Sequence, residues 1–96
     1  MSKKKDDDNK LFEKLLKLNI KYAIEDSNIN MSMIEIRIKY YQTLINHLEG
    51  NKPLFFQKKK LIEYNNKLEE YNNKINELYI EFHEETKLLE KLYEQI

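Results

Sequence analysis

Apolar residues beyond position 53 recur every seven residues along the chain. Two interleaved series form the pattern: Leu54, Leu61, Leu68, Ile75, Phe82, Leu89 and Ile96, with Tyr64, Tyr71, Leu78 and Leu92 between them. Gln57 and Glu85 interrupt the second series. A sustained seven-residue repeat is typical of a helix that presents one narrow apolar face to a coiled-coil partner. The pattern therefore predicts helical structure over residues 54–96.

The middle of this segment carries two opposing signals. Residues 63–68 read Glu-Tyr-Asn-Asn-Lys-Leu and residues 70–75 repeat them as Glu-Tyr-Asn-Asn-Lys-Ile. Asn is a weak helix former, so the four Asn residues favour a break within residues 64–73. The unbroken seven-residue repeat favours one continuous helix instead. Both alternatives stay open.

The first half of the chain has two apolar stripes at helical spacing. The first stripe consists of Ile34, Ile38, Tyr41, Ile45 and Leu48, extended upstream by Ile20, Ile24 and Met31. The second stripe consists of Ile29, Met33, Ile36, Tyr40 and Leu44. Together they cover roughly 200° of the helix circumference, whereas facing one core needs about 100°. This helix must therefore contact two neighbours.

The ends of the first helix follow from the local composition. Residues 1–10 contain no large apolar residue after Met1, which predicts a disordered charged tail. Gly50 is expected to end the first helix in a left-handed conformation, and Pro53 fits the first turn of the next helix. The sequence thus predicts a single helical domain over 11–96, with a helix at 11–49 and a turn at 50–53.

Two architectures satisfy these patterns. If residues 64–73 turn, the chain forms an all-α antiparallel three-helix bundle with a long first helix, which is the fold we expect. If they do not, the chain forms a two-helix coiled-coil hairpin that dimerises. An uncovered second stripe would expose five large side chains, each worth about 1.5–3 kcal/mol on burial.

The composition excludes several fold classes and several kinds of chemical site. One Gly and one Pro argue against a sheet protein and against a phosphate-binding glycine loop, and the absence of Cys excludes disulfides. Seventeen Lys and Arg balance seventeen Asp and Glu, so we expect neither nucleic acid nor membrane as a partner. His47 and His83 have no carboxylate at metal-binding helical spacing, and no Ser or Thr has the partners of a nucleophile. We expect no metal, no cofactor and no enzymatic activity.

Two groups of residues are candidates for partner binding. Phe55 and Phe56 adjoin the basic run Lys58, Lys59 and Lys60. Exposed aromatic side chains beside lysines could dock an acidic, partly apolar protein surface. The other group is part of the second stripe and comprises Met33, Ile36 and Tyr40.

Four segments of the chain resemble those of one known family. They are Ile20–Asp26, Leu48–Asn51, Gln57–Glu63 and Lys74–Phe82. In their order and polar signatures they resemble tubulin-binding cofactor A over roughly residues 15–82. The proline-containing second turn of that family has no counterpart around Leu68–Tyr71. The resemblance implies a three-helix chaperone that captures β-tubulin folding intermediates, with a cytoplasmic, cytoskeleton-associated location.

A second functional class stays open beside this one. The chain could be a structural coiled-coil subunit of a larger assembly, of the prefoldin-like, tethering or kinetochore type. Coverage of the second stripe by the chain itself favours the chaperone, whereas coverage by another chain favours the structural subunit. The corresponding oligomeric states are a monomer and a homodimer.

Overall fold

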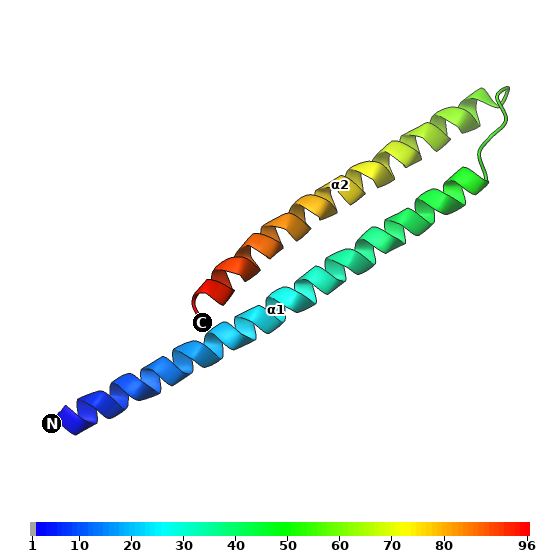
Figure 1. The fold of residues 1–96 in the computed structure, drawn as a ribbon. Helices are drawn as coiled ribbons and strands as arrows, with labels where there is room; N and C mark the ends of the chain where they lie inside the picture. Colours follow the sequence, from blue (N-terminus) through cyan, green and yellow to red (C-terminus); the bar gives the residue numbers. More distant parts are fainter. Residues whose placement is uncertain (1) are drawn as a thin grey trace.

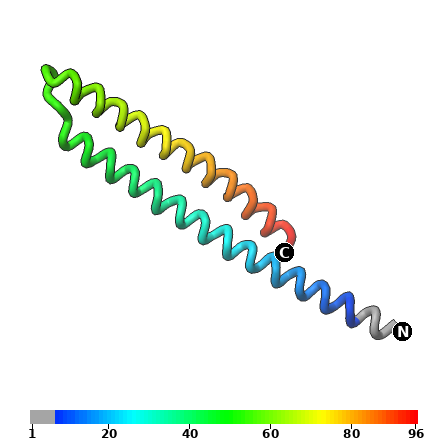
Figure 2. The backbone as a smooth tube through the Cα atoms, turned by 180° about the vertical axis from the view of Figure 1, so that it is seen from behind, coloured from blue at the N-terminus to red at the C-terminus, as the bar shows by residue number. Residues whose placement is uncertain are grey.

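The protein is a hairpin of two long antiparallel helices (Figures 1 and 2). The computed structural model describes the backbone of residues 2–96 and the side chains of residues 7–96. Helix α1 spans Ser2–Gly50 and helix α2 spans Lys58–Glu94, with no strand between residues 2 and 96. The all-α class is confirmed. The three-helix bundle is wrong, and the two-helix hairpin that was its alternative matches the structure.

Helix α2 runs without interruption through residues 64–73, so the break that would create a third helix does not form. Tyr64 is buried and Leu68 and Tyr71 are half-buried against α1, while the four Asn residues of this segment point into solvent. An unfavourable helix propensity costs a few tenths of a kcal/mol per Asn. Breaking the helix would remove three large side chains from the interface, which costs more.

The core is a single line of contacts between the helices, which we call the seam. Its spacing alternates between three and four residues on both helices, as in a coiled coil. On α1 the seam comprises Ile20, Ile24, Ser27, Met31, Ile34, Ile38, Tyr41, Ile45 and Leu48; on α2 it comprises Leu61, Tyr64, Leu68, Tyr71, Ile75, Leu78, Phe82, Glu85, Leu89 and Leu92. The most buried cluster lies at its centre, where Ile34, Ile38 and Leu78 meet. Of the two stripes predicted on α1, the first forms the core together with both series on α2, apart from the exposed ends Leu54 and Ile96.

The molecule is a rod. It measures 86 × 16 × 15 Å and has a radius of gyration of 23.3 Å, against about 12–13 Å for a compact domain of this length. A rod only two helices wide covers one face of each helix. Any second apolar face must therefore remain in solvent within the single chain.

The N-terminal part of α1 extends past the end of α2 (Figure 2). The structure places residues 2–10 in this helix, whereas their composition predicts a disordered tail. No Gly or Pro interrupts the chain before residue 50, so nothing in the local sequence stops the helix. All of residues 7–19 are exposed, and Ile20 is the first buried residue after them. We call residues 7–19 the overhang.

The end of α1 differs from the expected left-handed glycine turn. Gly50 is the last residue of the helix and its φ is not positive, so that prediction is wrong. Asn51 ends the helix instead. Its side-chain amide donates to the His47 carbonyl oxygen at 2.9 Å, and its backbone N–H donates to the Leu48 carbonyl oxygen at 3.1 Å. These bonds satisfy carbonyl groups that the last turn leaves free.

Helix α2 begins at Lys58, later than the predicted start near Pro53, so the connection covers residues 51–57 and not 50–53. Gln57 closes the connection. Its Oε1 accepts a hydrogen bond from the Leu54 N–H at 3.0 Å, and its own N–H donates to the Leu54 carbonyl oxygen at 2.9 Å. The turn over residues 54–57 holds the two intervening Phe residues outside both helices.

Candidate interaction surfaces

A second apolar line runs along α1 outside the seam, and we call it the outer stripe; two of its members, Met33 and Tyr40, also line grooves shared with α2. At about 100° per residue, its centre lies roughly 150° around the helix from the centre of the seam. Each of its side chains is between 43% and 66% exposed. The outer stripe comprises Leu11, Leu15, Leu18, Tyr22, Ile29, Met33, Ile36 and Tyr40.

The outer stripe is longer than the sequence patterns predicted. Its two halves are eighteen residues apart, which is about five full turns, so they lie on one line of a straight helix. The pairs are Leu11 with Ile29, Leu15 with Met33, Leu18 with Ile36, and Tyr22 with Tyr40. The upstream half was not identified from the sequence, although Leu15, Tyr22, Ile29 and Ile36 follow one seven-residue spacing into it. A search at eighteen-residue spacing finds it.

The structure brings the predicted residues Met33, Ile36 and Tyr40 together on this stripe. Leu44, which the sequence pattern adds to them, is half-buried. Tyr40 is connected to the core by aromatic contacts, because its ring meets that of Tyr41 edge-on at a centroid distance of 5.4 Å. Tyr41 in turn lies 6.0 Å from the ring of Tyr71 on α2. Tyr40 is therefore held in place while much of its surface faces solvent.

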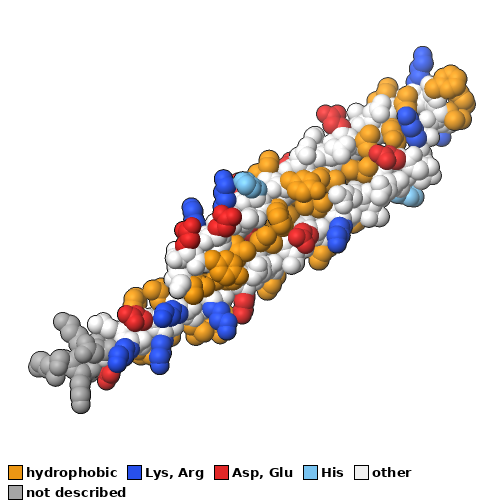
Figure 3. All heavy atoms as spheres, viewed as in Figure 1, with side chains coloured by type: hydrophobic (Ala, Val, Ile, Leu, Met, Phe, Trp, Pro, Cys, Tyr) orange, Lys and Arg blue, Asp and Glu red, His pale blue; other side chains and the backbone are white. Residues whose placement is uncertain are grey.

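The other predicted residues gather at the end of the rod, at what we call the hairpin tip. Phe55 is 86% exposed and Phe56 64%, and their rings meet edge to face at 5.6 Å. Lys58, Lys59 and Lys60 follow on the exposed first turn of α2. Figure 3 shows hydrophobic side chains gathered at this end of the molecule with basic side chains beside them. The predicted site residues thus form two separate surfaces.

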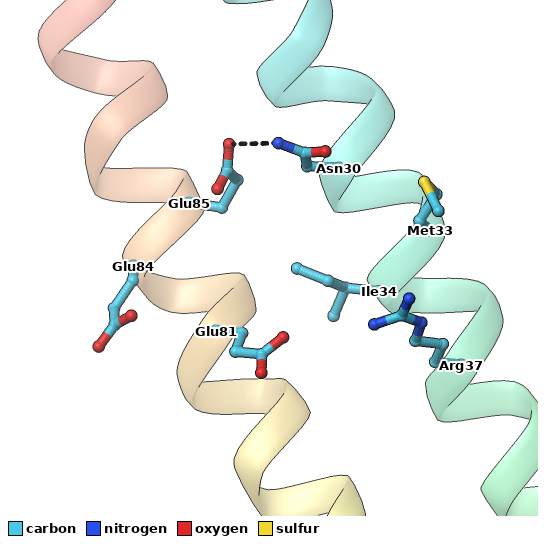
Figure 4. A pocket seen from close by; sticks show the side chains of 7 residues that line it. All are labelled: Asn30, Met33, Ile34, Arg37, Glu81, Glu84 and Glu85. Carbon is cyan, nitrogen blue, oxygen red and sulfur yellow. Dashed lines mark hydrogen bonds between the residues drawn. The ribbon is translucent and has the colours of Figure 1, made fainter.

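A groove between the helices lies near the middle of the rod (Figure 4). Asn30 from α1 donates a long hydrogen bond of 3.5 Å to Glu85 Oε1 from α2. Arg37 and Glu81 point toward one another across the groove, while Glu84 points away from α1. The groove is open along its length and carries one basic and three acidic side chains. This arrangement places complementary charges beside the seam.

The described residues offer no metal-binding cluster. Among residues 7–96, no three His, Asp or Glu side chains are grouped closely enough to hold an ion. In the part of the chain that the structure describes, neither helix has a stretch both long and apolar enough to cross a bilayer. The surfaces that stand out are apolar or basic, and both are suited to binding.

Comparison with known proteins finds no matching family model, no matching curated protein and no matching solved structure.

Proposed function

We propose that this protein is a structural coiled-coil subunit that assembles by packing the outer stripe of α1 against a second copy of the chain. The observation that carries this proposal is the line of eight large apolar side chains on the face of α1 that α2 does not cover. In a dimer this face becomes a second helix-helix interface. The hairpin then serves as a stiff spacer of the length of the rod.

The amount of exposed apolar surface supports assembly. Each side chain of the outer stripe has roughly 100 Å² of surface to bury, which makes about 800 Å² for each chain. That is the size of a standard stable protein interface. The accessible surface of the chain is 8327 Å², whereas a compact monomer of its mass exposes about 5,900 Å².

A second copy is the simplest occupant of this face. Every copy carries the same stripe, and a two-fold axis placed on it makes an interface in which both chains bury the same residues. The stripe presents only apolar groups and the Tyr22 and Tyr40 rings, whose hydroxyls can stay at the wet rim. Glu25 and Asp26 are exposed on either side of the gap between Tyr22 and Ile29, so the two apolar halves of the stripe pack while these carboxylates stay hydrated at the rim.

Sedimentation over a wide concentration range tests the proposal. We expect the unmodified chain to sediment as a dimer that dissociates on dilution. The double variant Met33→Lys, Ile36→Lys places two charges on the outer stripe and should weaken dimerisation about a hundredfold or more, because it removes two buried apolar groups. Its helical content, measured by circular dichroism, should stay unchanged.

The matched control is the double variant Asn28→Lys, Asn46→Lys. It adds the same two charges to exposed positions of α1 away from the stripe. This control should dimerise like the unmodified chain. A chain that stays monomeric at every concentration would contradict the proposal, as would equal dimerisation of the stripe variant and the control.

Capture of β-tubulin is our second candidate. The resemblance to tubulin-binding cofactor A predicts a three-helix chain, and residues 2–96 form two helices, so we rank this function below the structural one. Phe55 and Phe56 are exposed beside Lys58, and this feature supports β-tubulin capture as the second candidate. Retention of β-tubulin folding intermediates by the immobilised chain would support it, and loss of retention after Lys58→Glu, Lys59→Glu, Lys60→Glu would place it at the tip.

A further inference from the structure

The hairpin tip concentrates positive charge that the rest of the chain cancels. Between Gly50 and Ile62 the only charged residues are Lys52, Lys58, Lys59 and Lys60, a charge of +4, and with the adjoining Glu49 and Glu63 the charge of residues 49–63 is +2. Charges in salt solution act over about 8–10 Å, whereas the rod is 86 Å long. A partner at the tip therefore meets the local charge and not the net charge of zero.

The same end of the rod exposes large apolar side chains. Leu54, Phe55 and Phe56 project from the connection between the helices, and Ile62 is exposed one turn into α2. The hydrogen bonds between Gln57 and Leu54 hold the turn on which the two rings are mounted. The nearest groove, beside Pro53 and Tyr64, is not lined by any of these four side chains. The apolar groups thus form a convex projection with lysines around its base.

We propose that the hairpin tip docks on the surface of an anionic phospholipid bilayer. Leu54, Phe55 and Phe56 enter the headgroup region, while the four lysines lie at the level of the lipid phosphates. Apolar and aromatic side chains beside a basic cluster are the combination that binds proteins to such surfaces without spanning them. The net neutrality of the chain argues against a membrane only while the positions of the charges are unknown.

The shape of the tip favours a bilayer over other anionic partners. A protein partner would need a cavity that matches a convex projection, whereas lipid headgroups move apart to admit one. Single-stranded nucleic acid stacks successive bases on open aromatic faces. The Phe55 and Phe56 rings stand at 84° with the edge of one against the face of the other, which does not form such a platform.

Vesicle co-sedimentation of the full chain tests the proposal. We expect binding to vesicles of phosphatidylcholine with phosphatidylserine, weakening as salt is raised, and little binding to phosphatidylcholine alone. The variant Lys58→Gln, Lys59→Gln, Lys60→Gln should bind about a hundredfold more weakly. The variant Phe55→Ser, Phe56→Ser should bind about tenfold more weakly, because only Leu54 and the lysines remain at the tip.

A charge-matched control distinguishes docking by the tip from attraction between any lysines of the chain and the anionic vesicles. Lys10→Gln, Lys14→Gln, Lys17→Gln removes three exposed lysines from the overhang at the far end of α1. This control should bind vesicles like the unmodified chain, and all variants should keep their helical circular dichroism signal. The proposal would be overturned if the control lost as much vesicle binding as the Lys58→Gln, Lys59→Gln, Lys60→Gln variant, or if the Phe variant lost none.

Soluble polyanions test whether the tip binds a bilayer in particular or any anionic partner. A single-stranded oligonucleotide and polyglutamate should bind much more weakly than the anionic vesicles. Binding of either one as tightly as the vesicles, with the same dependence on Phe55 and Phe56, would overturn the proposal in favour of nucleic acid or an acidic protein. The assay does not depend on dimerisation, because a monomer presents the same tip.

Discussion

The two helices of the hairpin share one seam but differ in what they leave in solvent. Helix α2 also exposes large apolar residues, but these are spread around its circumference: Ile62, Tyr79, Ile80, Leu88 and Tyr93. On α1 eight of the ten such residues, those of the outer stripe, fall within about 60° of one another, and only Phe12 and Leu16 lie elsewhere. Scattered exposed apolar residues are ordinary on any protein surface, whereas an aligned set marks an interaction face. The alignment, and not the number of such residues, distinguishes α1.

The largest expected effect contrasts the two faces of α1 with a single residue type. Ile38 lies in the seam at 6% exposure, and Ile36 lies on the outer stripe at 66%. Ile38→Ala should lower the free energy of unfolding by about 2–5 kcal/mol, because it leaves a cavity in the core. Ile36→Ala should change it by less than about 0.5 kcal/mol at concentrations where the chain is monomeric. Urea denaturation followed by circular dichroism measures both.

A second contrast concerns the one polar residue buried in the seam on α1. Ser27 is 2% exposed and its Oγ has no hydrogen-bond partner. Ser27→Ala should raise the free energy of unfolding by about 1–2 kcal/mol, because an unpaired hydroxyl no longer has to be buried. Ser32→Ala makes the same change at an exposed position of the helix and should give a smaller gain from helix propensity alone. Equal gains at both positions would show that burial of the hydroxyl costs nothing.

Replacements on the solvent-facing side of α2 should give a smaller increase in the free energy of unfolding. Asn66 and Asn73 are exposed residues of a continuous helix, and they occupy it only because the seam keeps the segment helical. Replacing both by Ala should raise the free energy of unfolding by roughly 1 kcal/mol in total. Thermal melting measures the gain, and Lys67→Ala, which replaces a good helix former nearby, should leave the melting temperature almost unchanged. A loss of stability on the double replacement would contradict the continuous helix.

The smallest expected effect tests the end of α1. Gly50 has no positive φ, and a Cβ placed on it meets no atom within 4 Å. Gly50→Ala should therefore raise the free energy of unfolding by about 0.4–1 kcal/mol by restricting the unfolded chain. A left-handed glycine would give the opposite sign, so a loss of stability in chemical denaturation would restore the original expectation. Asn51→Ala is the complementary variant and should lower stability, because it removes the hydrogen bond to His47.

Part of the candidate site was accessible from the amino-acid pattern. Met33, Ile36 and Tyr40 were identified because their spacing leaves them off the seam, and Phe55 with the lysine run was identified from composition. Leu11, Leu15, Leu18 and Tyr22 were missed because the second stripe was traced only over residues 29–44, although Tyr22 already lies beside the seam residues Ile20 and Ile24. The exposure of Phe55 and Phe56 was also undetermined, because an aromatic pair at a turn can fold back onto the core or project from it.

The order of residues alone determined that this chain forms long helices with a seven-residue seam, because it contains almost no helix breakers and its apolar spacing fits no sheet. The tertiary structure decided that there are two helices and not three, where each one ends, and which stripe of α1 faces α2. These choices depend on sums of contacts along the whole rod. A local preference of a few tenths of a kcal/mol at Asn or Gly is outweighed when each further turn of the seam buries another large side chain.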